Sequence, residues 1–269
     1  MGPSVEAMTD VTFTREKVDA IPVIYIAPAA KNDRHQIAVF LPYLGGTKEA
    51  VATQLARLAE RGFTAINFDP WRLGERGDGD DRAVMNLVFS HFRRNMWPIL
   101  GQSTLDAMHV LDWACEHFDV RTDNIVAGGL SMGGDISVAL AGADHRVTRV
   151  AAVVATPDWT RPGMTRVGEP ENIIEQGVPN PYGAWFYDHL NPTTHPHNYA
   201  HGPAIAFELG ADDTHVPPAS ALAFHNNLKA AAPVAAARMR VTTHQGLDHI
   251  GAVRDQAVVE AALNWMSEN

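Results

Sequence analysis

Short apolar runs alternate with longer stretches of helical periodicity along most of the chain. Ile37–Leu41 is a continuous apolar run, which is typical of a strand buried on both faces of a sheet. The next segment, Lys48–Arg61, has apolar residues at helical spacing and stops at Gly62, a residue type that often follows the last helical turn. Because this alternation continues towards the C-terminus, the pattern predicts βαβ units.

Strands that alternate with helices favour a mainly parallel sheet with helices on both faces. The expected strands are Val11–Val18, Pro22–Ala27, Ile37–Leu41, Phe63–Phe68, Asn124–Ala127, Val150–Ala155, Ala204–Leu209 and Arg238–Thr242. The expected helices are Lys48–Arg61, Ala83–Asn95, Ser103–Phe118, Met132–Ala141, Pro217–Lys229 and Ala252–Met266.

One long segment interrupts the alternation. Residues 157–203 separate two predicted strands and are rich in Pro, Gly, His and aromatic residues. A loop of this length in a compact domain usually serves as a lid or a binding segment. Since the sequence has no internal repeat and no dividing linker, we expect residues 1–269 to form a single domain, with residues 157–203 as a lid insertion.

Composition narrows the possible function classes. The chain has 269 residues, a formal net charge of −10 and no basic tract, so nucleic acid and anionic membranes are not expected partners. The single cysteine, Cys115, excludes a disulfide framework and a CxxC motif. The first ten residues lack a positive flank followed by an apolar core, and no apolar run reaches the roughly 18 residues of a membrane span. We therefore expect a cytoplasmic protein.

The strongest chemical signal is a G-x-S-x-G motif formed by Gly129, Ser131 and Gly133. It follows an apolar strand and precedes a helical pattern, which is the setting of a nucleophile elbow. Such a turn holds its central residue in strained dihedrals and needs small neighbours where strand and helix meet. The motif therefore predicts that Ser131 is a nucleophile, exposed beside the free N–H groups of a helix N-terminus.

A serine nucleophile needs a histidine base, and the base needs a carboxylate that orients it. In this architecture the chain order is Ser, acid, His, with the acid and the histidine in loops after late strands. The strand Ala204–Leu209 leads to Asp212 and Asp213, and the last strand leads to His244 and His249. Spacing alone does not decide between Asp212 and Asp213 as the acid, or between His244 and His249 as the base.

These motifs resemble the α/β-hydrolase superfamily, in particular the small bacterial esterases of the dienelactone-hydrolase and prolyl-oligopeptidase-like group. The resemblance runs from about Val11 to the C-terminus and implies an α/β-hydrolase fold with a mainly parallel eight-stranded sheet. The family pattern G-x-x-D-x-x-V-P matches Gly210 to Pro217 and selects Asp213 as the acid. The family histidine precedes the C-terminal helix, which selects His249.

The resemblance also implies an oxyanion hole made of two backbone N–H groups. One belongs to Met132, the residue after the nucleophile, and the other to Leu44 in the loop after Ile37–Leu41. This loop departs from the family pattern, because Pro42 and Tyr43 stand where His and Gly are usual. The Tyr43 hydroxyl is therefore a candidate substrate contact as well.

Aromatic residues of the predicted lid are further candidates for substrate binding. Trp159, Trp185 and Phe186 are expected to line an acyl or alcohol pocket, as aromatics beside a nucleophile often do. The alternative for each is packing of the lid on the body. Arg72, in the segment that resembles the family's D-x-R-G-H-G loop, is expected to support the scaffold.

We expect neither a metal nor an organic cofactor. The histidines of the lid lack an Asp at metallohydrolase spacing, and the acidic turn Asp78–Asp81 lacks the downstream Glu of a calcium loop. Cys115 lies within a helical pattern, far from the elbow, and is expected to be a core residue.

The sequence therefore predicts a serine hydrolase that cleaves a small-molecule carboxylic ester through an acyl-enzyme intermediate. An amidase or peptidase and an acyltransferase would use the same triad. A binding or biosynthetic protein on the same fold is the alternative without hydrolysis, since one scaffold hosts many chemistries. An oligomer is compatible with the sequence.

Overall fold

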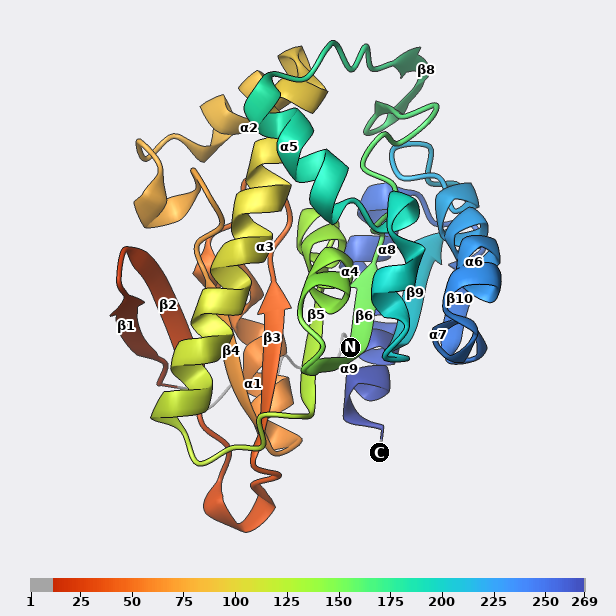
Figure 1. Cartoon of the computed structure of the whole chain (residues 1–269). Coiled ribbons are helices and arrows are strands. Elements are labelled where there is room, and N and C mark those ends of the chain that lie inside the picture. Colours follow the sequence, from red (N-terminus) through yellow and green to blue (C-terminus); the bar gives the residue numbers. More distant parts are fainter. Residues whose placement is uncertain (1–11, 269) are drawn as a thin grey trace, which may run out of the picture.

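A computed structural model describes residues 12–268, so Val11 at the start of the first predicted strand lies outside the described residues (Figure 1). Eight strands in this range form one sheet in the order β1-β2-β4-β3-β5-β6-β9-β10. The pairs β1–β2 and β2–β4 are antiparallel, and the other neighbouring pairs are parallel. The prediction of a mainly parallel eight-stranded sheet is confirmed. The strands are β1 (Thr14–Val18), β2 (Ile21–Ile26), β3 (Gln36–Leu41), β4 (Phe63–Phe68), β5 (Ile125–Leu130), β6 (Val147–Val153), β9 (Ala204–Gly210) and β10 (Met239–His244).

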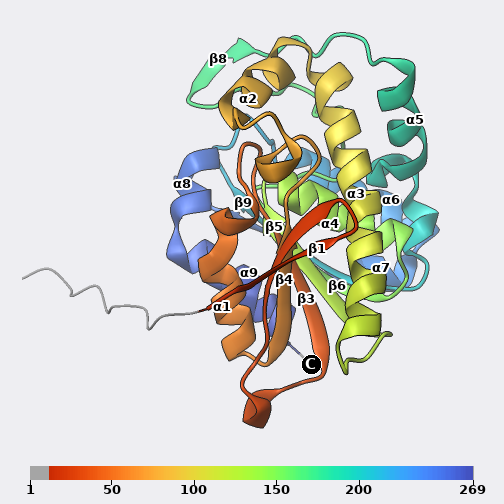
Figure 2. The same ribbon diagram turned by 90° about the vertical axis from the view of Figure 1, so that its left-hand side faces the viewer.

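Helices cover both faces of this sheet, as Figure 2 shows with the sheet seen nearly edge-on. One face is covered by α1 (Ala52–Glu60), α8 (His249–Arg254) and α9 (Gln256–Ser267). The opposite face is covered by α3 (Phe92–His117), α4 (Met132–Ala143) and α6 (Ala219–Ala231), with the short α7 (Pro233–Ala237) after α6. The central strands are buried along their whole length, which explains why their sequences are mainly apolar.

The region after β4 differs from its sequence-based prediction. Two separate helices were expected to leave residues 96–102 outside helical structure, whereas α2 (Asp81–Ser90) is followed after one residue by the 26-residue α3, which runs through Pro98. Proline lacks the N–H of a helical hydrogen bond and normally ends or kinks a helix. Here Pro98 is buried beside a second helix, α5 (Pro181–Leu190), so tertiary packing outweighs the local preference.

The predicted C-terminal helix Ala252–Met266 is divided into two helices. Asp248 caps α8 by accepting a hydrogen bond from the Gly251 N–H at 2.7 Å. Asp255 then caps α9 by accepting hydrogen bonds from two N–H groups of its first turn. His249 is consequently the first residue of a helix rather than part of a loop.

Residues 157–203, the expected lid, contain regular structure that the sequence did not predict. Its first part forms a hairpin of β7 (Thr165–Arg166) and β8 (Glu169–Ile173). Its second part contains α5, which packs along α3 (Figure 1). Phe186 of α5 lies over Gly101, where a Cβ would come within 2.1 Å of its ring. The α5 part is thus fastened to the body, while the hairpin is exposed along β8.

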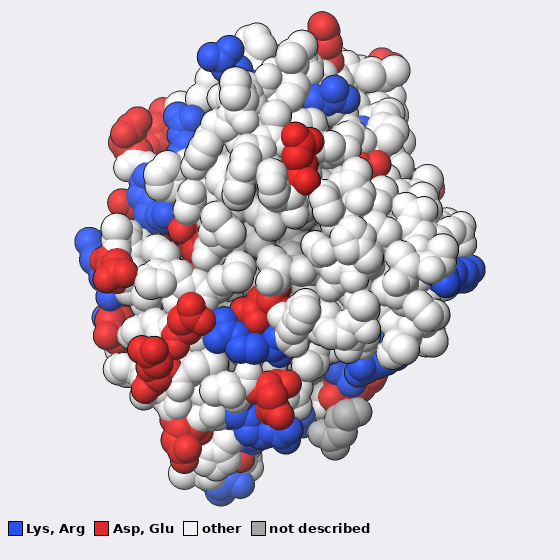
Figure 3. Space-filling view, in the orientation of Figure 1, with Lys and Arg blue, Asp and Glu red and all other residues white. Residues whose placement is uncertain are grey.

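Charged side chains are unevenly distributed on the face seen in Figure 3. They gather along its left and lower parts, whereas the area over α5 and α6 is almost free of them.

Among residues 12–268, none of the helices combines the length and hydrophobicity that a membrane crossing requires.

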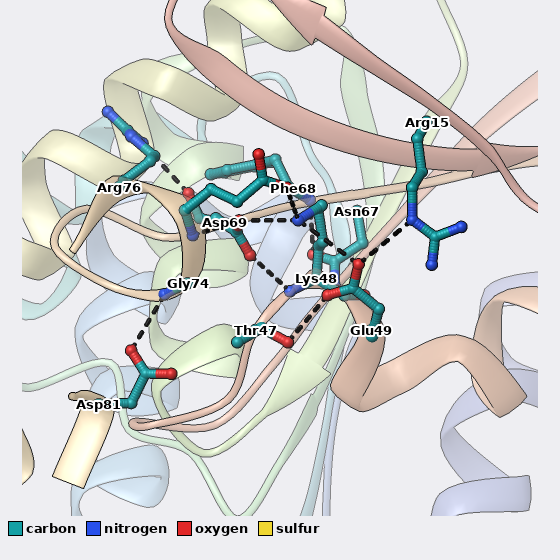
Figure 4. Close-up of polar contacts among 11 residues, drawn as sticks. Arg15, Thr47, Lys48, Glu49, Asn67, Phe68, Asp69, Gly74, Arg76 and Asp81 are labelled. Atoms are coloured by element: carbon teal, nitrogen blue, oxygen red, sulfur yellow. Dashed lines mark hydrogen bonds and ion pairs between the residues drawn. The ribbon is translucent and has the colours of Figure 1, made fainter. Parts of the chain in front are cut away.

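A buried ion pair fixes the loop that follows β3 (Figure 4). Lys48 ends this loop, and its Nζ donates to Asp69 Oδ2 at 2.9 Å and to Glu75 Oε1 at 2.6 Å. The Lys48 backbone N–H donates to the other oxygen of Asp69 at 2.8 Å. Burial alone would lower the pKa of Lys48, but the hydrogen bonds from its ammonium to Glu75 and Asp69 outweigh this effect and raise the pKa.

The same carboxylate also organises the loop after β4. Asp69 follows β4 directly, is fully buried, and accepts a third hydrogen bond, from the Glu75 N–H at 3.0 Å. Asn67 adds a hydrogen bond from its Nδ2 to the Lys48 carbonyl at 2.8 Å. Asp69 therefore links the ends of two neighbouring parallel strands, and the position of residues 43–47 depends on it.

Replacement of Lys48 by Met should destabilise the protein by about 3 kcal/mol, because breaking a buried pair leaves the Asp69 carboxylate without its cation. The matched control is Arg15→Ala, which breaks an exposed ion pair to Glu49 at 3.6 Å and should change the stability little. Urea unfolding of the wild type and both variants measures the difference. Equal stability of the Met variant and the wild type would contradict the anchoring role of Lys48.

Candidate active site

Ser131 lies at the sharp turn between β5 and α4. Its backbone has φ 50° and ψ −114°, a region that non-glycine residues rarely occupy. A Cβ at Gly129 would lie 2.5 Å from the Gly133 carbonyl carbon, and one at Gly133 would lie 2.2 Å from the Leu41 carbonyl oxygen. The two glycines of the motif are therefore required by the close approach of β3, β5 and α4 at the nucleophile elbow.

Three side chains from distant parts of the chain meet at this turn. The Ser131 hydroxyl lies 3.1 Å from His249 Nε2, and His249 Nδ1 lies 2.7 Å from Asp213 Oδ2. Since a carboxylate accepts hydrogen bonds, Nδ1 carries the imidazole proton and Nε2 presents a lone pair to the hydroxyl. Asp213 is oriented in turn by its Oδ1, which accepts from the N–H groups of His215 (2.9 Å) and Val216 (2.7 Å).

The geometry distinguishes between the paired candidates. Asp213 is buried and bonded to His249, whereas Asp212 is exposed. His244 lies on β10 and its Nε2 contacts the buried Glu208 at 2.8 Å. Glu208 and Arg240 share the sheet face with His244, and Arg240 packs over Trp265 of α9. Strand alternation thus directs His244 towards α9 and away from Ser131.

The expected oxyanion donors lie on the two segments that flank the nucleophile. Met132 is the first residue of α4, where backbone N–H groups have no partner within the helix. Leu44 lies in a turn closed by a hydrogen bond from the Gly46 N–H to the Tyr43 carbonyl at 2.9 Å. Gly45 has φ +85°, a conformation that suits glycine in this turn. The oxyanion role of Met132 and Leu44 stays a prediction.

Two of the candidate aromatics pack on the body of the protein. Trp159 and Phe186 are buried, with exposed fractions of 0% and 2%, and Phe186 lies on α5 where this helix packs on α3. Trp185 is half exposed on α5 and stacks on His189 at a ring separation of 4.3 Å. Tyr43 is 41% exposed in its turn. Substrate contacts of these four residues stay predictions.

Further residues line the space beside Asp213 and His249. A cavity of about 160 Å³ adjoins His249, Asp213 and His215 and is lined on one side by the hairpin residues Val167, Gly168 and Pro170. A second cavity, of about 390 Å³, lies between α2 and the same hairpin. It is lined by Asn86, Phe89, Ser90, Arg166, Val167, Glu169 and Ile174. The only sequence signal for His215 is its position two residues after the acid.

A second buried ion pair ties the start of residues 157–203 to α4. Asp135, on the first turn of α4, accepts hydrogen bonds from the Thr156 N–H at 2.7 Å and from the Arg161 guanidinium. Both charged side chains are buried, and Arg161 has φ +41°. The pair holds the backbone of residues 156–161 against the elbow.

Arg72, which was expected to support the scaffold, is exposed. The arginine that supports the loop after β4 is Arg76, which is bonded to Asp106 at 2.6 Å.

The lid histidines make separate local contacts. His195 Nδ1 contacts the Asn191 carbonyl at 3.2 Å, and His201 stacks on His145 at 4.5 Å. Within residues 12–268, no three Cys, His, Asp or Glu side chains are grouped so that they could hold a metal ion.

Comparisons with known proteins place this geometry in a family. The sequence profile of the prolyl oligopeptidase family matches residues 90–269, which is more than half of the chain. No curated protein sequence matches the chain at a significant level.

Three solved structures illustrate the similarity of the fold. Protein TT1662 from Thermus thermophilus is 20% identical, with a TM-score of 0.69 over 97% of this chain and 100% of that chain. A candidate dienelactone hydrolase from Klebsiella pneumoniae is 16% identical, with a TM-score of 0.65 over 96% and 99% of the two chains. A puromycin-hydrolyzing peptidase from Mycobacterium tuberculosis is 15% identical, with a TM-score of 0.70 over 97% of this chain. The match spans only 40% of the mycobacterial peptidase.

The profile covers the elbow, the acid loop and the histidine, and the neighbours share the sheet and its helices. The chain therefore has the α/β-hydrolase fold and belongs to the prolyl oligopeptidase family of serine hydrolases.

Proposed function

We propose that this protein hydrolyses a small carboxylic ester through Ser131, His249 and Asp213. The observation that carries the proposal is the unbroken chain of hydrogen bonds from the Ser131 hydroxyl through the His249 imidazole to the Asp213 carboxylate. The strained backbone of Ser131 and the burial of all three side chains support it, because reactive groups are held by their surroundings in geometries that isolated residues avoid.

The proposed reaction has two acyl-transfer steps. Ser131 Oγ attacks the ester carbonyl while His249 Nε2 takes its proton, and Asp213 stabilises the resulting imidazolium. The N–H groups of Met132 and Leu44 stabilise the oxyanion, a contribution of about 3–4 kcal/mol per donor in related enzymes. His249 then protonates the leaving alcohol, and a water activated by the same imidazole releases the acid from Ser131.

A fluorophosphonate should label the wild type stoichiometrically at Ser131, because phosphonylation needs an activated hydroxyl and oxyanion donors. Ser131→Ala should abolish the adduct in intact-mass spectra. The matched control is Ser137→Ala on the same helix, since Ser137 Oγ donates only to main-chain carbonyls of Gly128 and Gly133 and is not expected to react. Absence of an adduct on the folded wild type would refute the proposed nucleophile.

Removal of the proposed base should eliminate turnover. His249→Ala should lower kcat by at least about 10³-fold, since the nucleophile then lacks its proton acceptor. His244→Gln keeps a donor for the buried Glu208 and should retain most of the activity. Ester hydrolysis under saturating substrate measures both, and the reverse pattern would assign the base to His244.

Peptide or amide hydrolysis is the second candidate, favoured by the family match and by the peptidase among the structural neighbours. An amine leaves only after protonation, so amide cleavage depends more on the general acid than ester cleavage does. With one acyl group as p-nitrophenyl ester and p-nitroanilide, we expect kcat/KM to favour the ester by about 10²-fold or more. Comparable values for the two substrates would favour the peptidase.

A further inference from the structure

His215 connects the lid hairpin to the proposed triad. Its side chain is buried on the acid loop, and its ring meets the His249 ring edge-on at a centroid distance of 4.8 Å. On its other side the ring meets Phe89 of α2, which lines the larger cavity, at 5.7 Å. His215 thus separates the proposed base from the space between α2 and the hairpin.

The hairpin is tied to this part of the acid loop by three hydrogen bonds. The His215 ring donates from Nδ1 to the Thr165 carbonyl at 2.7 Å. The Thr165 N–H donates to the Thr214 carbonyl at 3.0 Å, and the two threonine hydroxyls lie 2.6 Å apart. Of the groups that form these hydrogen bonds, the His215 imidazole is the one that also contacts the His249 ring. Because a carbonyl can only accept, the His215 ring is neutral or protonated with Nδ1 as the donor.

The surroundings of His215 favour its neutral form. Burial, the Arg161 guanidinium and the charge that His249 acquires lower the pKa of His215 from 6.5 to about 3, although the hydrogen bond to Thr165 opposes this shift. Arg161 is itself paired with Asp135. The acid loop and the start of α8 add the carboxylates of Asp212, Asp213 and Asp248 beside His215. The other elements around it carry Arg166, Glu169 and Glu171 on the hairpin and Asp81 and Arg82 at the far end of α2.

We infer that His215 is a positioning residue that couples closure of the hairpin (residues 165–173) to the orientation of His249. The inference rests on the proposed function, since it concerns access to Ser131. Ser131 and His249 are each only 7% exposed, and the smaller cavity beside His249 is lined on one side by the hairpin. Entry of a bulky substrate would displace the hairpin, and this displacement would break the Thr165–His215 hydrogen bond.

This coupling gives hairpin opening a defined pH dependence. In the closed state His215 resists protonation, whereas in the open state it is solvated and regains an ordinary pKa near 6.5. The open state therefore binds the extra proton, so opening is favoured as pH falls through about 6.5 and closure is favoured above it. The equilibrium should move by about tenfold between about pH 7.5 and about pH 5.5.

Two probes of Ser131 measure access separately from reactivity. Diisopropyl fluorophosphate is small, and a fluorophosphonate that carries a fluorophore is bulky and needs the open hairpin. Both react with the same hydroxyl and base, so the ratio of their labelling rates cancels the ionisation of His249. For the wild type the bulky-to-small ratio should rise about tenfold from about pH 7.5 to about pH 5.5.

Variants of His215 and Thr165 separate the effect of the titratable imidazole from that of the other hydrogen bonds. His215→Asn keeps a donor for the Thr165 carbonyl without a titratable group, so its ratio should stay low and independent of pH. His215→Leu removes the donor to the Thr165 carbonyl and should give a high ratio at both pH values. Thr165→Val removes the hydrogen bond between the two threonine hydroxyls but keeps the His215 imidazole. This variant should therefore raise the ratio and retain its pH dependence. The matched control is His225→Asn, since His225 contacts the Ala236 carbonyl on the far side of α6 and should behave as the wild type.

A wild-type ratio that does not change with pH, or an Asn variant that keeps the wild-type pH dependence, would overturn the coupling. Failure of the small probe to label Ser131 at either pH would instead refute the proposed nucleophile, and the inference would fall with it. Loss of stability alone would slow both probes together and leave their ratio unchanged, so equal slowing in the Leu variant also counts against a role of His215 in closure.

Discussion

The candidate site depends on one steric constraint: three main-chain segments meet so closely at the elbow that two of them have no room for side chains. The Leu41 carbonyl at the end of β3 would lie within 3 Å of a Cβ at either Gly129 or Gly133. This contact brings the N-terminus of α4 against the sheet and forces Ser131 into its left-handed conformation. It also sets the loop after β3, with the expected oxyanion donor Leu44, beside the serine. The positions of Ser131 and of the loop that carries Leu44 are therefore fixed by the same contact.

Two buried ion pairs lie close to Ser131, unlike the exposed ion pairs at the surface. Lys48–Asp69 and Asp135–Arg161 are buried pairs, each of which also bonds main-chain N–H groups of a loop that reaches the elbow. A buried pair adds little net stability by itself because desolvation offsets its attraction. Its directional hydrogen bonds, however, leave few alternative positions for the loops. The Lys48–Asp69 pair thus fixes the loop after β3, and the Asp135–Arg161 pair fixes the start of residues 157–203.

The sequence predicts those parts of the protein that local patterns determine. Mainly apolar runs identify the buried strands. The G-x-S-x-G motif identifies the elbow because a side chain at either glycine would collide with the neighbouring main chain. Asp213 required the family pattern, since Asp212 has the same chemistry and nearly the same place in the chain. The sequence predicts a gap at residues 96–102, whereas α3 is continuous through Pro98, because the contact that covers Pro98 comes from α5, more than 80 residues later. For Trp159 and Phe186, composition indicates that residues 157–203 are rich in aromatics but not which side faces the core, so their burial could not be predicted.

His215 illustrates what remains hidden in a sequence even when a motif is recognised. It lies within the pattern that identifies the acid, yet its partners, Thr165, Phe89 and His249, come from three distant segments. Its backbone N–H orients Asp213, and its ring joins the hairpin to the base. A single residue thus bonds to the proposed acid, touches the proposed base and holds the hairpin. Because the His215 ring packs against His249, movement of the hairpin would change the surroundings of this imidazole, and our proposal therefore links access to Ser131 with the environment of its base.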